Sequence, residues 1–240
     1  MPSVAVKVSI IIPVIRPESA RRCVEAIRRN AGPGLEPEAD YEILAEPDTN
    51  RIGCPRMVKR LTARSRGEMV LFLGDDTLPQ NGFLAKALEA MASLPGGWGM
   101  VGLNDRVHDG NHTATHWMCH KKLLPLLGGE FFHTGYLHTR CDRELTERCQ
   151  ALGRYVWAEE AVLEHAHPSL QGRELTGDYR RVYSVDYLKH DRALYKRRKA
   201  AGWPDPPPHE DAGGSSILYV VPKEEEKTLP RGMDSAAWVA

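Results

Sequence analysis

The sequence lacks paired cysteines, long apolar runs and any excess of one charge. Its five cysteines include no C-x-x-C pair and are odd in number, which disfavours both a zinc ribbon and a disulfide framework. No apolar run approaches the roughly 18 residues that a membrane-spanning helix needs, and the N-terminus lacks the pattern of a secretory signal. With 32 basic and 32 acidic residues, the chain has no general attraction to nucleic acid or anionic membranes. We therefore expect a cytoplasmic enzyme or binding protein with no transmembrane segment.

The two commonest phosphate-binding motifs of α/β proteins are missing as well. No G-x-G-x-x-G follows the first strand-like run, and no G-x-x-x-x-G-K-[S/T] occurs anywhere in the sequence. Dinucleotide-binding and Walker-type proteins are therefore disfavoured.

Apolar strand-like runs and helical segments alternate through the first hundred residues. The runs at 6–14 and 69–73 are almost continuously apolar, which is typical of strands buried on both faces of a parallel sheet. Pro17 and Pro55 suit the first turn of a helix. The pattern predicts an α/β protein with strands at 6–14, 41–45, 69–73 and 100–103, and with helices that begin at Pro17, Pro55 and Phe83.

The rest of the chain is less regular. Residues 104–140 are rich in histidine, glycine and aromatic residues, and their pattern assigns no element. Beyond residue 200, proline and glycine become frequent, as in a linker, although 217–221 could add a late strand. Between these regions we expect helices at 142–152, ended by Gly153, and at 187–199, with short strands at 155–157 and 161–163.

Acidic residues follow two of the expected strands. Glu46 and Asp48 come after the second strand, and Asp75 and Asp76 come directly after the third. The carboxyl ends of parallel strands lie at one edge of the sheet, where α/β proteins bind ligands. Two adjacent carboxylates repel each other unless a cation or proton intervenes, and oxygen ligands suit Mg²⁺ or Mn²⁺. The residues alone also allow a solvated Asp-Asp turn.

The order of these motifs resembles the GT-A nucleotide-sugar glycosyltransferases, especially the large inverting group called family 2. The opening strand VSIIIP at 8–13, the segment GEMVLFLGDDTLP at 67–79 and the helix at 81–88 are similar to the donor-binding part of that group. A second block is similar to its acceptor-side part, in the same order: DREL at 142–145, Gly153, and EAVLEH at 160–165. Together the two blocks cover roughly residues 6–167.

The resemblance implies a GT-A-like, Rossmann-related fold, with a mostly parallel sheet flanked by helices and a C-terminal extension to the single domain. Residues 1–103 would bind the nucleotide sugar, 104–200 would form the acceptor side, and 201–240 would be linker and tail. It also implies roles for eight residues: Pro13 and Arg16 near the base, Glu46 and Asp48 on base or ribose, Asp75 and Asp76 between metal and diphosphate, Asp142 as catalytic base, and His165 as a further metal or diphosphate ligand.

Three positions depart from the family pattern. Gly74 stands where the commoner version has a third acid, so that metal binding would depend on Asp75 and Asp76. Glu46 replaces the usual Asp, and Cys141 replaces the Glu that often precedes the base.

Several candidate residues also have ordinary structural explanations. An isolated Asp at a helix start, such as Asp142, is commonly a cap. His165 and His167 alternate along a strand, so they point the same way, and one of them is a more plausible metal ligand than both. Lys59 and Arg60 could face the diphosphate, but basic residues on helices are usually solvated.

The sequence therefore favours a metal-dependent inverting glycosyltransferase, with Mn²⁺ or Mg²⁺ as cofactor. Its donor would be a nucleoside-diphosphate sugar, with a UDP-sugar favoured, and its hydroxyl acceptor could be a glycan, protein, lipid-linked intermediate or modified nucleic acid base. One alternative is a nucleotidyltransferase, although only Arg16, Arg21 and Arg22 could serve the triphosphate loop that it needs. The other is a non-catalytic module that binds nucleotides or sugars.

Overall fold

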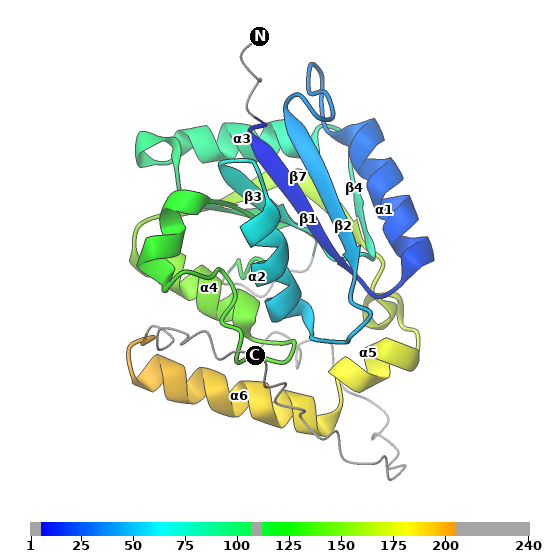
Figure 1. Ribbon diagram of the computed structural model, residues 1–240, viewed down its shortest axis with the longest axis vertical. Coiled ribbons are helices and arrows are strands. Elements are labelled where there is room, and N and C mark those ends of the chain that lie inside the picture. Colours follow the sequence, from blue (N-terminus) through cyan, green and yellow to red (C-terminus); the bar gives the residue numbers. More distant parts are fainter. Residues whose placement is uncertain (1–5, 107–111, 205–240) are drawn as a thin grey trace.

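A mixed seven-stranded sheet forms the centre of the protein in the computed structural model, which describes residues 6–106 and 112–204 (Figure 1). The strand order is β2-β1-β3-β6-β5-β7-β4, and β4 and β6 run opposite to the other five. The strands are β1 (Val8–Val14), β2 (Tyr41–Pro47), β3 (Met69–Phe72), β4 (Thr77–Pro79), β5 (Met100–Asn104), β6 (Trp117–His120) and β7 (Tyr155–His165).

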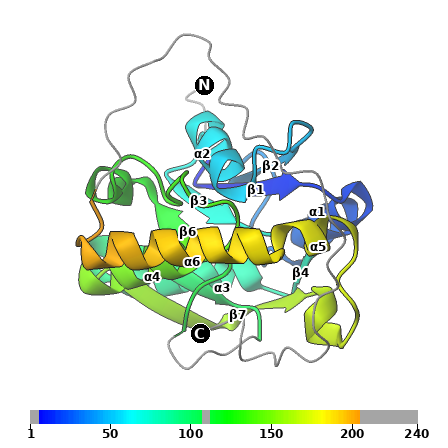
Figure 2. The same cartoon turned by 90° about the horizontal axis from the view of Figure 1, so that it is seen from below.

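Helices cover both faces of this sheet. The helices are α1 (Pro17–Asn30), α2 (Cys54–Arg64), α3 (Phe83–Ser93), α4 (Cys141–Ala151), α5 (Gly177–Val182) and α6 (Val185–Ala200). Apolar residues of α1 and α3 pack in one buried cluster, and those of α2 and α4 pack in a second. Figure 2 shows α5 and α6 following one another in front of the sheet when the molecule is viewed from below. No helix in the described ranges is both long enough and apolar enough to cross a membrane.

Most of the predicted elements are confirmed. The first three strands and their helices lie within a few residues of the expected bounds, and Gly153 ends α4 with a positive φ of 65°. Two expectations need correction: β6 lies in the region that had no assignment, and the two short strands expected at 155–163 form one strand, β7, with an irregularity where it pairs with β5. The late strand expected at 217–221 lies outside the described residues. The division of the domain into a donor-binding part that ends at residue 103 and an acceptor-side part that begins at residue 104 stays a prediction.

Backbone pairing brings four chain segments to one end of the sheet. Thr77 of β4 pairs with His165 of β7, and the amide of Ala166 donates to the carbonyl of Asp76 at 2.9 Å. The amide of Leu103 in β5 donates to the carbonyl of His116 at 3.0 Å, just before β6. Four side chains therefore lie at or next to the ends of strands on the same edge of the sheet: Asp76, Asp105, His116 and His165.

Candidate active site

Asp75 fixes the chain where β1 passes into α1. Its carboxylate accepts the backbone N–H groups of Ile15 at 2.8 Å and Arg16 at 2.7 Å, and the side-chain Nε of Arg16 at 2.9 Å. Only 2% of the residue is exposed. Both carboxylate oxygens thus have donors from the polypeptide itself, and Asp75 orients Arg16 toward its neighbour, Asp76.

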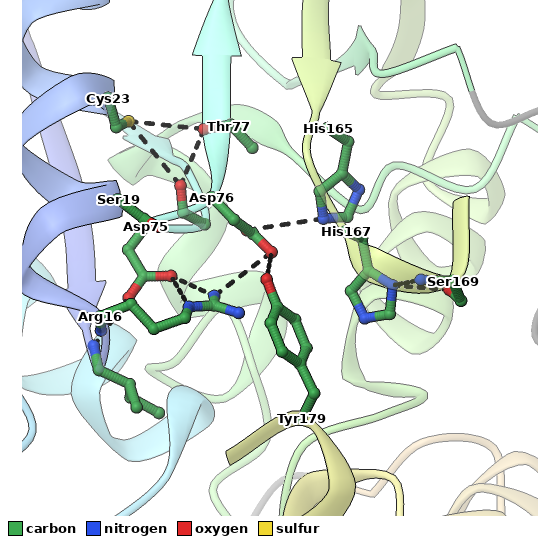
Figure 3. Close-up of polar contacts among 12 residues, drawn as sticks. Arg16, Ser19, Cys23, Asp75, Asp76, Thr77, His165, His167, Ser169 and Tyr179 are labelled. Carbon is green, nitrogen blue, oxygen red and sulfur yellow. Dashed lines mark hydrogen bonds and ion pairs between the residues drawn. The ribbon is translucent and has the colours of Figure 1, made fainter. Parts of the chain in front are cut away.

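Asp76 faces the opposite side of the site, toward β7 and α5 (Figure 3). One carboxylate oxygen lies 3.6 Å from Nε2 of His165, and the other accepts a hydrogen bond from the hydroxyl of Tyr179 and lies 3.3 Å from the guanidinium of Arg16. Burial opposes ionisation, but His165, Arg16 and Tyr179 outweigh it and hold the pKa of Asp76 well below its usual range. Asp76 is therefore an ionised, buried carboxylate.

Tyr179 joins α5 to this acidic pair. The guanidinium of Arg16 lies over its ring, 4.1 Å from the centroid, an arrangement that favours a cation on an aromatic face. A second link runs from Arg51 to Asp178 at 3.5 Å. Helix α5 thus lies directly against the site, although no role for Tyr179 was predicted from the sequence.

Asp105 and His116 join His165 in a cluster that could hold a metal ion. One potential ligand atom from each residue lies within 4.8 Å of the others. Oδ2 of Asp105 is 3.5 Å from Nδ1 of His116 and 3.6 Å from Nδ1 of His165. Burial opposes the charged imidazole, but Asp105 and Asp76 prevail and raise the pKa of His165 to about 9.

Two buried imidazole nitrogens at this edge, one of them in the cluster, could bind a cation. Nδ1 of His165 and Nε2 of His167 have no hydrogen-bond partner among the described residues. The other nitrogen of His167 contacts the hydroxyl of Ser169 at 2.6 Å, and burial lowers the pKa of His167 to about 4. A neutral imidazole can bind a metal through its lone pair.

Sequence reasoning missed Asp105 and His116. Both lie within the stretch from 104 to 140 that had no assignment, and 11 positions separate them. The available signal was an acid directly after an expected strand, the same signal that identified Asp75 and Asp76. The strand that follows His116 was not recognised, so its position at the sheet edge could not be inferred.

Asp142 is the second residue of α4, and Arg140 occupies the capping position, without a side-chain cap. The carboxylate of Asp142 accepts the backbone N–H of Arg143 at 2.8 Å. Burial raises the pKa of the Tyr183 phenol, and Asp76 and Asp142 both raise it further. In the same way Asp142, Asp75 and Asp48 add to the burial that raises the pKa of the Cys54 thiol. Asp142 and the acidic pair therefore act electrostatically on the same two side chains, Tyr183 and Cys54.

The remaining predicted residues have partners within the protein. Asp48 accepts the backbone N–H groups of Ile52 at 2.8 Å and Gly53 at 2.9 Å, and so shapes the loop before α2. Pro13 lies in β1 opposite Glu46 of β2. Helix α2 forms ion pairs from Arg60 to Glu46 at 2.7 Å, from Arg64 to the same Glu46, and from Lys59 to Glu130 at 3.1 Å. The predicted contacts of these residues with a nucleotide stay predictions.

Comparison with known proteins shows a likeness of structure. No family model matches the chain, and no curated protein matches its sequence. A mutant of Drosophila β1,4-galactosyltransferase 7, in complex with manganese, UDP-Gal and xylobiose, aligns with a TM-score of 0.51 and 13% identity, over 76% of this chain and 79% of that chain. Mannosyltransferase PcManGT from Pyrobaculum calidifontis, in complex with GDP-Man and Mn²⁺, aligns with a TM-score of 0.53 and 14% identity, over 82% of this chain and 76% of that chain. TarS from S. aureus, in complex with UDP, aligns with a TM-score of 0.50 and 13% identity, over 81% of this chain and 72% of that chain.

The chain has the GT-A fold. The fold class that the sequence predicted is confirmed by these structures, and the resemblance to GT-A proteins is confirmed at the level of the fold. Identities of 13–14% establish the GT-A architecture alone, so the arguments about activity depend on this chain's own residues.

Proposed function

We propose that this GT-A protein is a metal-dependent glycosyltransferase that moves a sugar from a nucleoside-diphosphate donor to a hydroxyl acceptor with inversion. The observation that carries the proposal is the convergence of buried ionised carboxylates and unbonded imidazole nitrogens at the sheet edge. Arg16 and the imidazolium of His165 neutralise part of this charge, and a divalent cation could take the place of the His165 proton. The manganese and nucleotide sugars bound by the two GT-A structural neighbours support the same function.

Asp142 would be the general base of the transfer. It would accept the proton of the acceptor hydroxyl while the acceptor oxygen forms a bond to the anomeric carbon. The bond from that carbon to the diphosphate oxygen breaks, and the nucleoside diphosphate leaves with the electron pair. The start of α4 favours the ionised carboxylate, because unpaired backbone N–H groups and the helix dipole stabilise negative charge.

The diphosphate would lie beside Asp76, His165 and Arg16. A divalent cation bound there supplies electrostatic stabilisation of the charge that develops on the leaving group. Arg16 already lies between Asp75 and Asp76, and its guanidinium could turn toward a phosphate oxygen. Asp75 would act mainly by keeping Arg16 in place.

The nucleoside end of the donor would lie at the ends of β1 and β2, near Pro13 and the loop that Asp48 shapes. Glu46, Lys59 and Arg60 would contact the donor only by exchanging their present ion-pair partners. A UDP-sugar remains the favoured donor, and the acceptor is one of the four classes named above.

Donor binding and turnover provide the test. Nucleotide sugars would be screened for stabilisation of the protein with and without Mn²⁺, because ligands that bind only the folded state raise its melting temperature. Release of nucleoside diphosphate should then fall by about 100-fold or more in Asp142→Asn, with donor stabilisation retained. Asp186→Asn is the matched control, since Asp186 is also an acid in the first turn of a helix, α6.

Two results would contradict the proposal. If no nucleotide sugar in the screen raises the melting temperature, the protein is not a nucleotide-sugar enzyme. Donor binding with equal turnover in the wild type and in Asp142→Asn would exclude Asp142 as the base.

A further inference from the structure

The β5–β6 hairpin places two side chains in the proposed cation site. Asp105 directly follows β5, and His116 directly precedes β6, so the two residues meet at the end of the hairpin where the two strands are connected. The hydroxyl of Thr115 donates to Asp105, so Nδ1 of His116, 3.0 Å from the hydroxyl oxygen, donates to Thr115 and Nε2 keeps the lone pair of this ring. This hairpin is a second group of polar residues, separate from the acidic pair after β3.

The distance from Asp105 to His165 is too long for a hydrogen bond and suitable for a shared ion. Oδ2 of Asp105 lies 3.6 Å from His165 Nδ1, whereas N–H···O bonds span about 2.7 to 3.2 Å. Two ligand atoms at about 2.1 Å from one ion stand about 3.0 to 3.6 Å apart when they subtend about 90° to 120°. Nδ1 of His165 is buried and has no hydrogen-bond partner among the described residues, and one potential ligand atom of His116 lies within 4.8 Å of the other two.

The space above Gly74 explains why residue 74 carries no side chain. A Cβ atom there would lie 2.8 Å from Oδ1 of Asp76 and 3.3 Å from Nε2 of His116. The imidazole of His116 thus lies against the face of Gly74 on which a side chain at this position would begin.

The two nitrogens of His165 face different carboxylates. Nδ1 lies toward Asp105, and Nε2 lies 3.6 Å from Asp76. In histidine metal sites, one ring nitrogen binds the ion while the other donates to an outer carboxylate, which fixes the tautomer and the ring orientation. With the ion on the Nδ1 side, Asp76 is the carboxylate nearest the other nitrogen, and the 3.6 Å between them would shorten for Nε2–H to donate to it.

We propose that Asp105, His116 and His165 bind the divalent cation, that Asp76 orients His165 from the other side, and that the site selects a transition metal such as Mn²⁺ over Mg²⁺. The inference rests on the proposed function only for the role of the cation in transfer. Mg²⁺ prefers oxygen ligands in octahedral geometry, whereas two imidazoles with one carboxylate suit Mn²⁺, Fe²⁺, Co²⁺ or Zn²⁺.

Metal binding to the full chain, without any donor, tests this assignment. Calorimetric titration of the wild type should show Mn²⁺ binding at least about 10-fold tighter than Mg²⁺. Spin-echo modulation spectra of the bound Mn²⁺ should contain couplings to coordinated imidazole nitrogen. Asp105→Asn and His116→Gln should each weaken Mn²⁺ binding by more than about 100-fold, whereas His190→Gln, at an exposed histidine of α6, should leave it unchanged.

Equal affinity for Mg²⁺ and Mn²⁺, or spectra without nitrogen coupling, would overturn the proposal on the wild type alone, even if the variants failed to fold. Asp76→Asn distinguishes an ion on the Nδ1 side of His165 from one on the Nε2 side. If it weakens Mn²⁺ binding more than Asp105→Asn does, the ion lies at Asp76 instead. The proposed function fails independently, because the metal could bind as described in a protein that no nucleotide sugar stabilises. Conversely, turnover with Mg²⁺ and no nitrogen coupling would retain the transferase and remove this site.

Discussion

At the scale of single residues, neighbouring side chains leave no room for a Cβ atom at position 74. Asp76 and His116 both lie close to the face of this glycine, and its φ is not in the left-handed region. The glycine is therefore required by space and not by backbone conformation.

Substitution at residue 74 should damage the site in proportion to the size of the new side chain. We expect Gly74→Ala to push Asp76 aside and to weaken Mn²⁺ binding by about 10-fold or more. Gly74→Asp should be worse, although it restores the commoner acidic sequence, because its carboxylate would overlap the space of His116. Calorimetric titration of both variants is the measurement, and tighter Mn²⁺ binding in Gly74→Asp would contradict the expectation.

Glu42 provides a pH-dependent contribution to stability far from the site. It accepts the hydroxyl of Ser9 at 2.6 Å and two N–H groups of Arg66 at 2.7 Å each. Burial opposes ionisation, but these donors lower the pKa of Glu42 below its ordinary value of 4.5. The stabilisation is therefore complete above about pH 4.5 and is lost as the pH falls through the lowered pKa.

Glu42→Gln should reduce the unfolding free energy at pH 7 and flatten its decline below about pH 4.5. Urea unfolding at a series of pH values measures both effects. Glu25→Gln, at an exposed position of α1, is a suitable control. The same acid-dependent decline in Glu42→Gln as in the wild type would show that other groups are responsible.

At the scale of elements, α6 holds the segment that leads into α4. Asp191 of α6 is fully buried, and its carboxylate accepts the backbone N–H groups of Leu137, His138 and Thr139 at 2.7–2.9 Å. This segment ends just before Cys141, where α4 begins. A helix near the end of the described chain thus fixes the approach to Asp142.

Asp191→Ala should lower the unfolding free energy by about 3 kcal/mol, because three buried N–H groups lose their acceptor. Asp191→Asn should cost less, since its amide oxygen can still accept. Chemical unfolding compares both with Asp186→Ala, an exposed acid on the same helix, which should have little effect. A loss below about 1 kcal/mol in Asp191→Ala would mean that water replaces the carboxylate.

The elements predicted correctly from the sequence are helices with an apolar period over several turns and strands with a nearly continuous apolar run. The apolar run of β3 has no polar interruption, that of β1 has only Ser9, and Pro17 and Pro55 mark helix starts. The four-residue strand β6 is too short to show a period, and its neighbours His116 and His120 are polar. Because the hairpin was missed, two members of the candidate metal cluster were missed with it, whereas Asp76 and His165 were found from motifs.

At the scale of the molecule, the site joins parts of the chain that are distant in sequence. Its residues come from the end of β1, the turn after β3, the β5–β6 hairpin, the end of β7 and helix α5. A cation bound among them would link these segments in the folded state only, so that metal binding should add directly to stability.

Mn²⁺ at about 100 times its dissociation constant should raise the unfolding free energy by about 2.7 kcal/mol. Removal of the metal with a chelator should reverse the gain. Thermal unfolding with and without Mn²⁺ is the measurement, and His116→Gln should show a much smaller difference than the wild type. A melting temperature that is independent of Mn²⁺ in the wild type would contradict a cation site of this affinity.

The pairing of β4 with β7 also limits where the chain can change in length. Thr77 lies opposite His165, and Asp76 is bonded to Ala166 through its backbone. Asp75 and Asp76 form the turn that leads into β4, so one residue inserted between Gly74 and Thr77 would displace a carboxylate from the imidazole while the sheet itself persisted. Homologues that retain this chemistry should accordingly vary in loop length elsewhere, and keep the spacing from β3 to β4 constant.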